Sequence, residues 1–141
     1  MYIQGVDNVF DLKFNRDGVT YGQVFLENER QMSRWHFEVA DTASLFDLFR
    51  KATAEAENSL SAGLAIPAYE QAIKASHVFN MLQARGVVSQ TERAGYIGRI
   101  RDLARGCAEK YLASREALGF PMLGAAERAL FLPPSVEVGH A

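Results

Sequence analysis

The chain has 141 residues, enough for one domain or one domain with a tail, and carries a net charge of −2 with 48% hydrophobic residues. This composition is typical of a globular protein and excludes disordered and collagen-like chains. No run approaches the roughly 18 apolar residues of a membrane span, and acidic residues near the N-terminus argue against a signal peptide. The single cysteine, Cys107, excludes an internal disulfide and a cysteine-based zinc site, so we expect a cytoplasmic protein.

The first twenty residues predict the end of a helix followed by a short β-hairpin. Residues 2–5 have no capping residue before them, and they end on a glycine that suits a helix C-terminus. Apolar and polar residues alternate from Phe10 to Phe14, which is the period of a half-buried strand. The pair Asp17-Gly18 marks a turn, after which residues 19–21 are expected to return as a second strand.

Two helices are predicted next from their capping residues. Thr20 and Gln23 have the spacing of a capping box, in which each side chain satisfies the backbone amide of the other, and a helix over 21–37 should follow. Asp41 is the expected N-cap of a second helix over 42–61, because its carboxylate can accept from the first free amides.

A third helix is expected to begin near Pro67, which suits a first turn, and to be closed by Gly86. Its polar strip is narrow. A helix that is apolar over most of its circumference is typical of a central, buried position. The residues that make it so are Tyr69, Ala72, Ile73, Ala75, Val78, Phe79 and Leu82.

The fourth helix has the clearest start and end. Ser89 and Glu92 form a second predicted capping box, and the helix should run to about Leu118, where Gly119 ends it. Its length would be about 43 Å at 1.5 Å per residue. A further short helix is predicted over 125–131. Three glycines share one face and indicate either close approach of another backbone or tolerated surface positions: Gly95, Gly98 and Gly106.

An arginine stripe on the fourth helix is the most suggestive functional feature. Arg101, Arg105 and Arg115 fall on one side of the helix, next to its apolar face, and residues 85–115 carry seven basic and three acidic side chains. Arginine binds phosphates and carboxylates as a planar fork, so the stripe suits an RNA backbone or an acidic protein surface. The alternative is pairing within the domain, with the acid-rich first half of the chain.

No catalytic or metal-binding motif is apparent in the sequence. The histidines at 36, 77 and 140 are far apart and lack the i,i+4 partner of a helical metal pair. The stretch GYIGRIRDLARG lies inside a predicted helix and is not a phosphate-binding loop. We therefore assign no catalytic, cofactor-binding or metal-binding residue to this chain.

Several sequence stretches resemble one enzyme family in the same order along the chain: MYIQGVDNVFDL, VTYGQVF, NERQMSRWHFEVAD, PAYE, KASHVFN, SQTER, YIGRIRDLA and SREALGFP. Over about residues 1–123 the chain resembles the C-terminal region of the α subunit of bacterial glycyl-tRNA synthetase. That family is a class II aminoacyl-tRNA synthetase of two α and two β chains, which attaches glycine to its tRNA with ATP through glycyl-adenylate. The resemblance implies ATP and magnesium for the parent enzyme, with neither expected on this chain.

The resemblance also implies a division of the chain. Residues 1–20 would be a remnant of the class II catalytic core, 21–123 a C-terminal helical domain, and 124–141 a loosely ordered tail. The implied partners are the β subunit, a second α subunit and, in the full assembly, tRNA; no membrane is expected. A fragment of a larger subunit should expose apolar side chains where the missing core packed, and we expect that patch at Tyr2, Ile3, Val9 and Phe10.

The expected fold is therefore mainly α, with about four principal helices and a short N-terminal β-hairpin. The expected function is a part in subunit packing within the ligase, without a complete active site. The alternative is a stand-alone helical module that binds tRNA or a protein through the arginine stripe.

Overall fold

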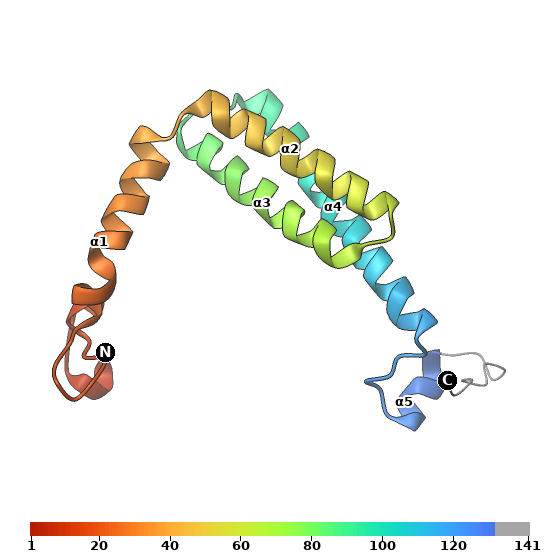
Figure 1. The fold of residues 1–141 in the computed structure, drawn as a ribbon, viewed down its shortest axis with the longest axis horizontal. Coiled ribbons are helices and arrows are strands. Elements are labelled where there is room, and N and C mark those ends of the chain that lie inside the picture. The colour runs from red at the N-terminus through yellow and green to blue at the C-terminus, as the bar shows by residue number, and fades with distance from the viewer. Residues whose placement is uncertain (132–141) are drawn as a thin grey trace.

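A computed structural model describes residues 1–131 and confirms a mainly α fold (Figure 1). Two 3-10 turns come first, and a π-helical turn follows the first α-helix. The elements are η1 (Tyr2–Gln4), η2 (Val9–Asp11), α1 (Tyr21–Arg34), η3 (Trp35–Val39), α2 (Thr42–Ser61), α3 (Ala65–Ala84), α4 (Gln90–Ala117) and α5 (Ala125–Phe131). The first predicted helix thus ends at Arg34, and its last turn continues as the π-helix η3.

The predicted N-terminal β-hairpin is wrong. Residues 1–131 contain no strand, and the segment makes one isolated antiparallel bridge between Lys13 and Thr20. The side-chain amide of Gln4 occupies the other edge of Lys13, accepting from its backbone N at 2.8 Å and donating to its backbone O at 3.0 Å. The apolar side chain of Phe14 stacks on Tyr21, with ring centroids 5.7 Å apart, instead of facing a second strand. The alternation of apolar and polar residues from Phe10 to Phe14 therefore reflects packing against α1 and not a β-strand.

The predicted caps are present. Both capping boxes form with both of their hydrogen bonds, at Thr20 with Gln23 and at Ser89 with Glu92. Asp41 accepts from the backbone N of Ser44 at 2.8 Å. Three of the helices end at a glycine in the left-handed region, with two backbone bonds closing the last turn: Gly63 after α2, Gly86 after α3 and Gly119 after α4.

The core lies where α2, α3 and α4 pack together, and we call these helices the three-helix unit. Alanines at the contact allow the helix backbones to approach closely: Ala56 and Ala72 are almost fully buried together with Leu103. Larger side chains fill the other end of the core. They are Leu45, Phe49, Val78, Phe79, Met81 and Leu82, with Tyr96 packed against them.

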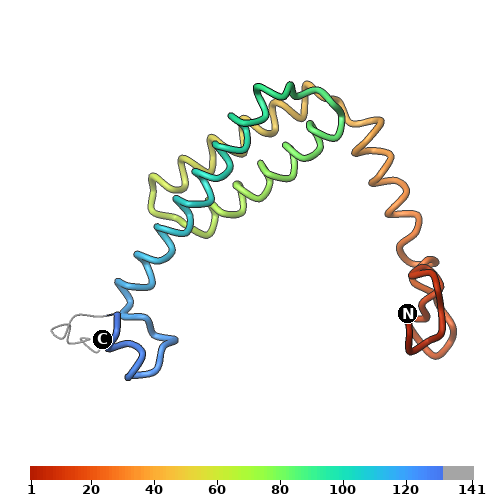
Figure 2. Tube along the Cα trace, turned by 180° about the vertical axis from the view of Figure 1, so that it is seen from behind, coloured from red at the N-terminus to blue at the C-terminus, as the bar shows by residue number. Residues whose placement is uncertain are grey.

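The three-helix unit forms the top of an open arch, which both views show (Figures 1 and 2). One side descends as the N-terminal leg, residues 1–39, and the other as the end of α4 followed by α5. Within the described residues, the leg touches the three-helix unit only where η3 contacts α3. No residue of the leg is buried.

One expectation about α3 is wrong. Its apolar circumference predicted a central, buried helix, yet Ile66 is 73% exposed, Tyr69 54% and Ile73 51%. The reason is that α2 and α4 both lie on one side of α3 and cover the face that carries Ala68, Ala72 and the other buried residues. The second apolar face of α3 has no covering element among residues 1–131.

Candidate docking surfaces

The predicted N-terminal patch is partly exposed. Tyr2 and Ile3 are 99% and 97% exposed and Val9 is 40% exposed, whereas Phe10 is half-buried. Phe10 lies close against the start of α1, where a Cβ added to Gly22 would stand 2.9 Å from the Phe10 backbone O and 3.1 Å from its Cβ. A glycine at position 22 therefore allows η2 to pack closely on α1.

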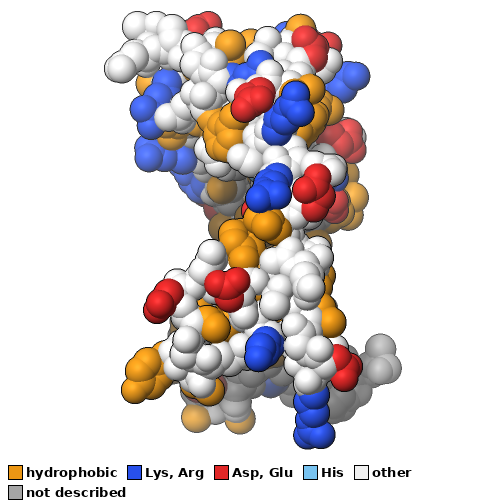
Figure 3. Space-filling view, turned by 90° about the vertical axis from the view of Figure 1, so that its left-hand side faces the viewer, with side chains coloured by type: hydrophobic (Ala, Val, Ile, Leu, Met, Phe, Trp, Pro, Cys, Tyr) orange, Lys and Arg blue, Asp and Glu red, His pale blue; other side chains and the backbone are white. Residues whose placement is uncertain are grey.

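A larger apolar surface runs along α1 and η3. The spacing of Val24, Phe25 and Met32 places these apolar side chains of α1 on one side of the helix, and η3 adds further apolar residues after it. All of them are between 37% and 61% exposed: Val24, Phe25, Met32, Trp35, Phe37 and Val39. Figure 3, which views the molecule from the side of the leg, shows hydrophobic side chains at the surface, among them a group at the narrow waist. Because these side chains are already about half covered, burying the rest of each would contribute roughly half of the 1.5–3 kcal/mol gained when an exposed apolar side chain is fully buried. An amphipathic helix with this exposure is typical of a docking surface.

The leg joins the three-helix unit through a contact that the sequence reasoning missed. His36 in η3 and His77 in α3 lie with ring centroids 5.3 Å apart at an interplanar angle of 72°, and His36 Nε2 is buried without a hydrogen-bond partner among the described residues. Nearby, Arg85 Nη1 donates to the backbone O of Ala40 at 2.6 Å. No local pattern could have paired the two histidines, because they come from different elements and are 41 residues apart.

The arginine stripe lies on α4. Arg105 pairs with Asp102 on its own helix at 2.8 Å. Among residues 1–131, no carboxylate lies within 4.0 Å of Arg101 or Arg115. Pairing with the acid-rich first half does occur, but it uses a different arginine.

That arginine is Arg99, whose Nη2 lies 3.0 Å from Glu57 Oε1 of α2. Both side chains are about half exposed, so the pair contributes on the order of 0–1 kcal/mol. The intradomain alternative therefore applies to Arg99 and not to the stripe.

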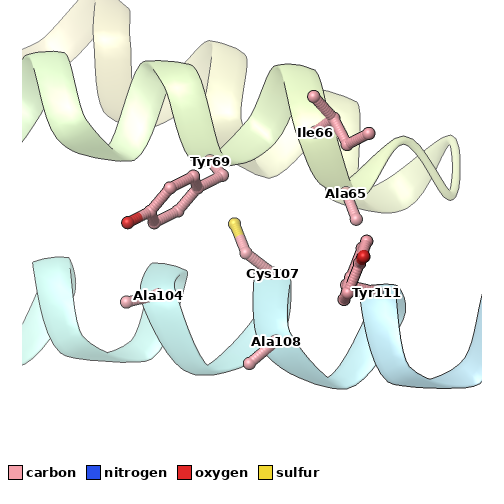
Figure 4. Close-up of a pocket in the computed structure, with 7 residues that line it drawn as sticks. All are labelled: Ala65, Ile66, Tyr69, Ala104, Cys107, Ala108 and Tyr111. Carbon is pink, nitrogen blue, oxygen red and sulfur yellow. The ribbon is translucent and has the colours of Figure 1, made fainter. Parts of the chain in front are cut away.

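A pocket of about 310 Å³ lies between the start of α3 and the middle of α4 (Figure 4). The figure shows Tyr69 of α3 and the thiol of Cys107 of α4 pointing into the space between the two helices. Cys107 is buried, and desolvation raises the pKa of its thiol, which keeps it protonated and unreactive at neutral pH. The full lining is Ala65, Ile66, Tyr69, Ala104, Cys107, Ala108 and Tyr111.

The pocket does not fit a nucleotide triphosphate or magnesium, because its lining contains no charged side chain. Nor does any group of three or more His, Cys, Asp or Glu residues in the part of the chain described by the structure come close enough to hold a metal ion. Over the same residues, every helix is too short or too polar to cross a membrane. The apolar lining is instead suited to an apolar group.

The chain was compared with models of known protein families. A model described as glycyl-tRNA synthetase alpha subunit matches residues 1–116. The match covers the leg and nearly all of the three-helix unit, and it confirms the resemblance seen in the sequence. This chain belongs to the glycyl-tRNA synthetase alpha subunit family.

Proposed function

We propose that this chain is the C-terminal helical region of a glycyl-tRNA synthetase α subunit and that it acts in subunit packing. The observation that carries the proposal is the N-terminal leg: it contains no buried residue, yet it presents an amphipathic helix with its apolar side half exposed. A segment of this kind gains its stability from protein that covers it. Family membership supplies the context, a ligase that assembles from α and β subunits.

In this proposal, residues 1–20 belong to the end of the catalytic core, 21–123 form the helical domain and 124–141 are a tail. Helix α5 lies within that tail, and residues 132–141 lie outside the described residues. ATP and magnesium act in the catalytic core of the parent enzyme, which attaches glycine to its tRNA through glycyl-adenylate in the cytoplasm. The helical region itself has no complete active site.

The direct test is ATP–pyrophosphate exchange with glycine. The purified chain is assayed alone, and the parent enzyme with both subunits serves as the positive control. We expect exchange by the parent enzyme and none by the chain alone. Robust glycine-dependent exchange by the chain alone would show that it holds a complete site and would refute the proposal.

The packing role is tested separately, by binding to the purified β subunit and by sedimentation. We expect the chain to bind the β subunit. We also expect concentration-dependent sedimentation if a second copy covers the apolar side of α1. Charge introduced there by Val24→Glu should weaken association, whereas Glu29→Lys, an exposed change on the same helix, is the control for altered charge. A chain that stays monomeric and binds no subunit contradicts this role.

A second function is supported by one observation, the two stripe arginines that have no carboxylate within 4.0 Å among residues 1–131. In this alternative the chain is a stand-alone helical module that binds tRNA or a protein through Arg101, Arg105 and Arg115. A salt titration of tRNA binding tests it, because each phosphate contact adds to the salt dependence. Absence of salt-dependent binding at low ionic strength would remove the RNA version.

A further inference from the structure

One side of α4 is covered by no other described helix. Positions 101, 105, 108, 112 and 115 follow one another in steps of four, three, four and three residues, so they lie on this one side, which we call the seam. The first four of these residues are exposed and Arg115 is half-buried. The contacts of α4 with α2 and α3 use a different face, which carries the buried Leu103 and Cys107.

The apolar pocket opens beside this seam, and one residue belongs to both. Ala108 lines the pocket and also stands on the seam between Arg105 and Leu112. Across the pocket, α3 contributes Ile66 and Tyr69, which are more than half exposed. A helix lying along the seam would therefore have an apolar pocket directly beside its line of contact. We call the seam and the pocket together the α4 groove.

The charge of the α4 groove indicates which charges a partner helix would carry. The stripe arginines at its two ends, Arg101 and Arg115, have no carboxylate within 4.0 Å among the described residues. They are separated by fourteen residues, or about 21 Å along the helix, with Ala108 midway. A second helix running alongside repeats its own side chains at the same seven-residue interval. Carboxylates on such a helix could meet both arginines while an apolar side chain enters at the middle.

We propose that the α4 groove docks an acidic amphipathic helix of the β subunit, which places an apolar side chain in the pocket and carboxylates against Arg101 and Arg115. This inference rests on the proposed function, since it names the contact by which the subunits would pack. An RNA backbone could use the same arginines, but it offers no aliphatic side chain for a pocket lined by alanine, isoleucine and tyrosine. The combination of pocket and arginines thus favours a protein helix.

The test measures the affinity of the full chain for the purified β subunit by calorimetry. The double variant Arg101→Glu with Arg115→Glu reverses the charge at both ends of the α4 groove. Ala108→Phe places a large side chain where the seam meets the pocket, at an exposed helix position and without changing any charge. Lys110→Glu is the control, because it reverses a single positive charge at an exposed position pointing to the other side of α4, and each single variant, Arg101→Glu and Arg115→Glu, is compared with it. Circular dichroism melting of each variant verifies that the three-helix unit remains folded.

We expect the double variant and Ala108→Phe each to weaken binding about tenfold or more, and Lys110→Glu to change it less than about threefold. If the native chain binds the β subunit and all variants bind equally well, this inference is wrong while the proposed function stands. If the native chain does not bind the β subunit at all, this inference fails, and the proposed packing role fails with it when the chain also stays monomeric. If the double variant loses salt-dependent tRNA binding and keeps its affinity for the β subunit, the stripe is an RNA surface and the inference is overturned.

Discussion

Two glycines inside α4 provide a prediction of increased stability. A Cβ built on Gly95 or on Gly98 meets no heavy atom within 4 Å, and neither residue has a positive φ. Alanine at a helix-interior position is favoured over glycine by about 0.8–1.0 kcal/mol, because glycine loses more backbone entropy on folding. The double variant Gly95→Ala with Gly98→Ala should therefore raise the free energy of unfolding by about 2 kcal/mol.

The measurement is urea denaturation followed by circular dichroism at 222 nm, since α4 is part of the cooperative core. Gly106→Ala is the comparison, because its Cβ would lie 3.0 Å from Leu60 Cδ1 and the side chain must shift to accept it. We expect its gain to be smaller than that of either open position. A double variant that is no more stable than the native chain would refute the reasoning that both glycines face open space.

Three further predictions concern two contacts between segments and one helix cap. Gly22→Ala should detach η2 from α1, because the new Cβ would stand 2.9 Å from the backbone O of Phe10; faster hydrogen exchange over residues 9–22 is the readout. Arg85→Ala removes the donor to the backbone O of Ala40 and should cost about 1–3 kcal/mol in urea denaturation. Hydrogen bonds from Ser44 hold the pKa of Asp41 below its ordinary 3.8, so the stability that this carboxylate contributes at neutral pH is lost as the pH falls through the lowered pKa. Asp41→Asn keeps a capping oxygen and should reduce that acid-induced loss, measured as urea midpoints between pH 6 and pH 3.

Local signals predicted the helices well because they act within a few residues. The capping box at Ser89 and Glu92 needs only its own four residues to satisfy the first amides of α4, and the structure has both bonds. The same holds for the left-handed glycine at 119, whose backbone N donates to the O of Glu116 at 2.8 Å while Phe120 N donates to the O of Arg115 at 2.9 Å. Such features depend little on the rest of the fold.

Features that depend on distant residues were not predictable in the same way. The hairpin prediction rested on alternation near Phe14, but the ring of this residue stacks on Tyr21 of α1, and Gln4 satisfies the edge that a strand would have paired. The contact of His36 with His77 needs the π-helix η3 to lie against α3, and no pattern in either segment encodes it. The side of α4 that carries the stripe was predictable from spacing, whereas the pocket beside it required the position of α3.

Helix α3 has two apolar faces, and only one of them is covered by the described chain. One face, with Ala72, Ala75 and Leu82, is fully used in the core, which explains how the three-helix unit holds together. The opposite face keeps Ile66 and Ile73 more than half exposed, although an exposed face gains nothing from large apolar residues. The sequence is that of a helix with neighbours on both sides, and the described chain supplies them on one side only. Helix α1 likewise has an apolar side that the described chain does not cover. Both surfaces therefore support the proposed role in subunit packing.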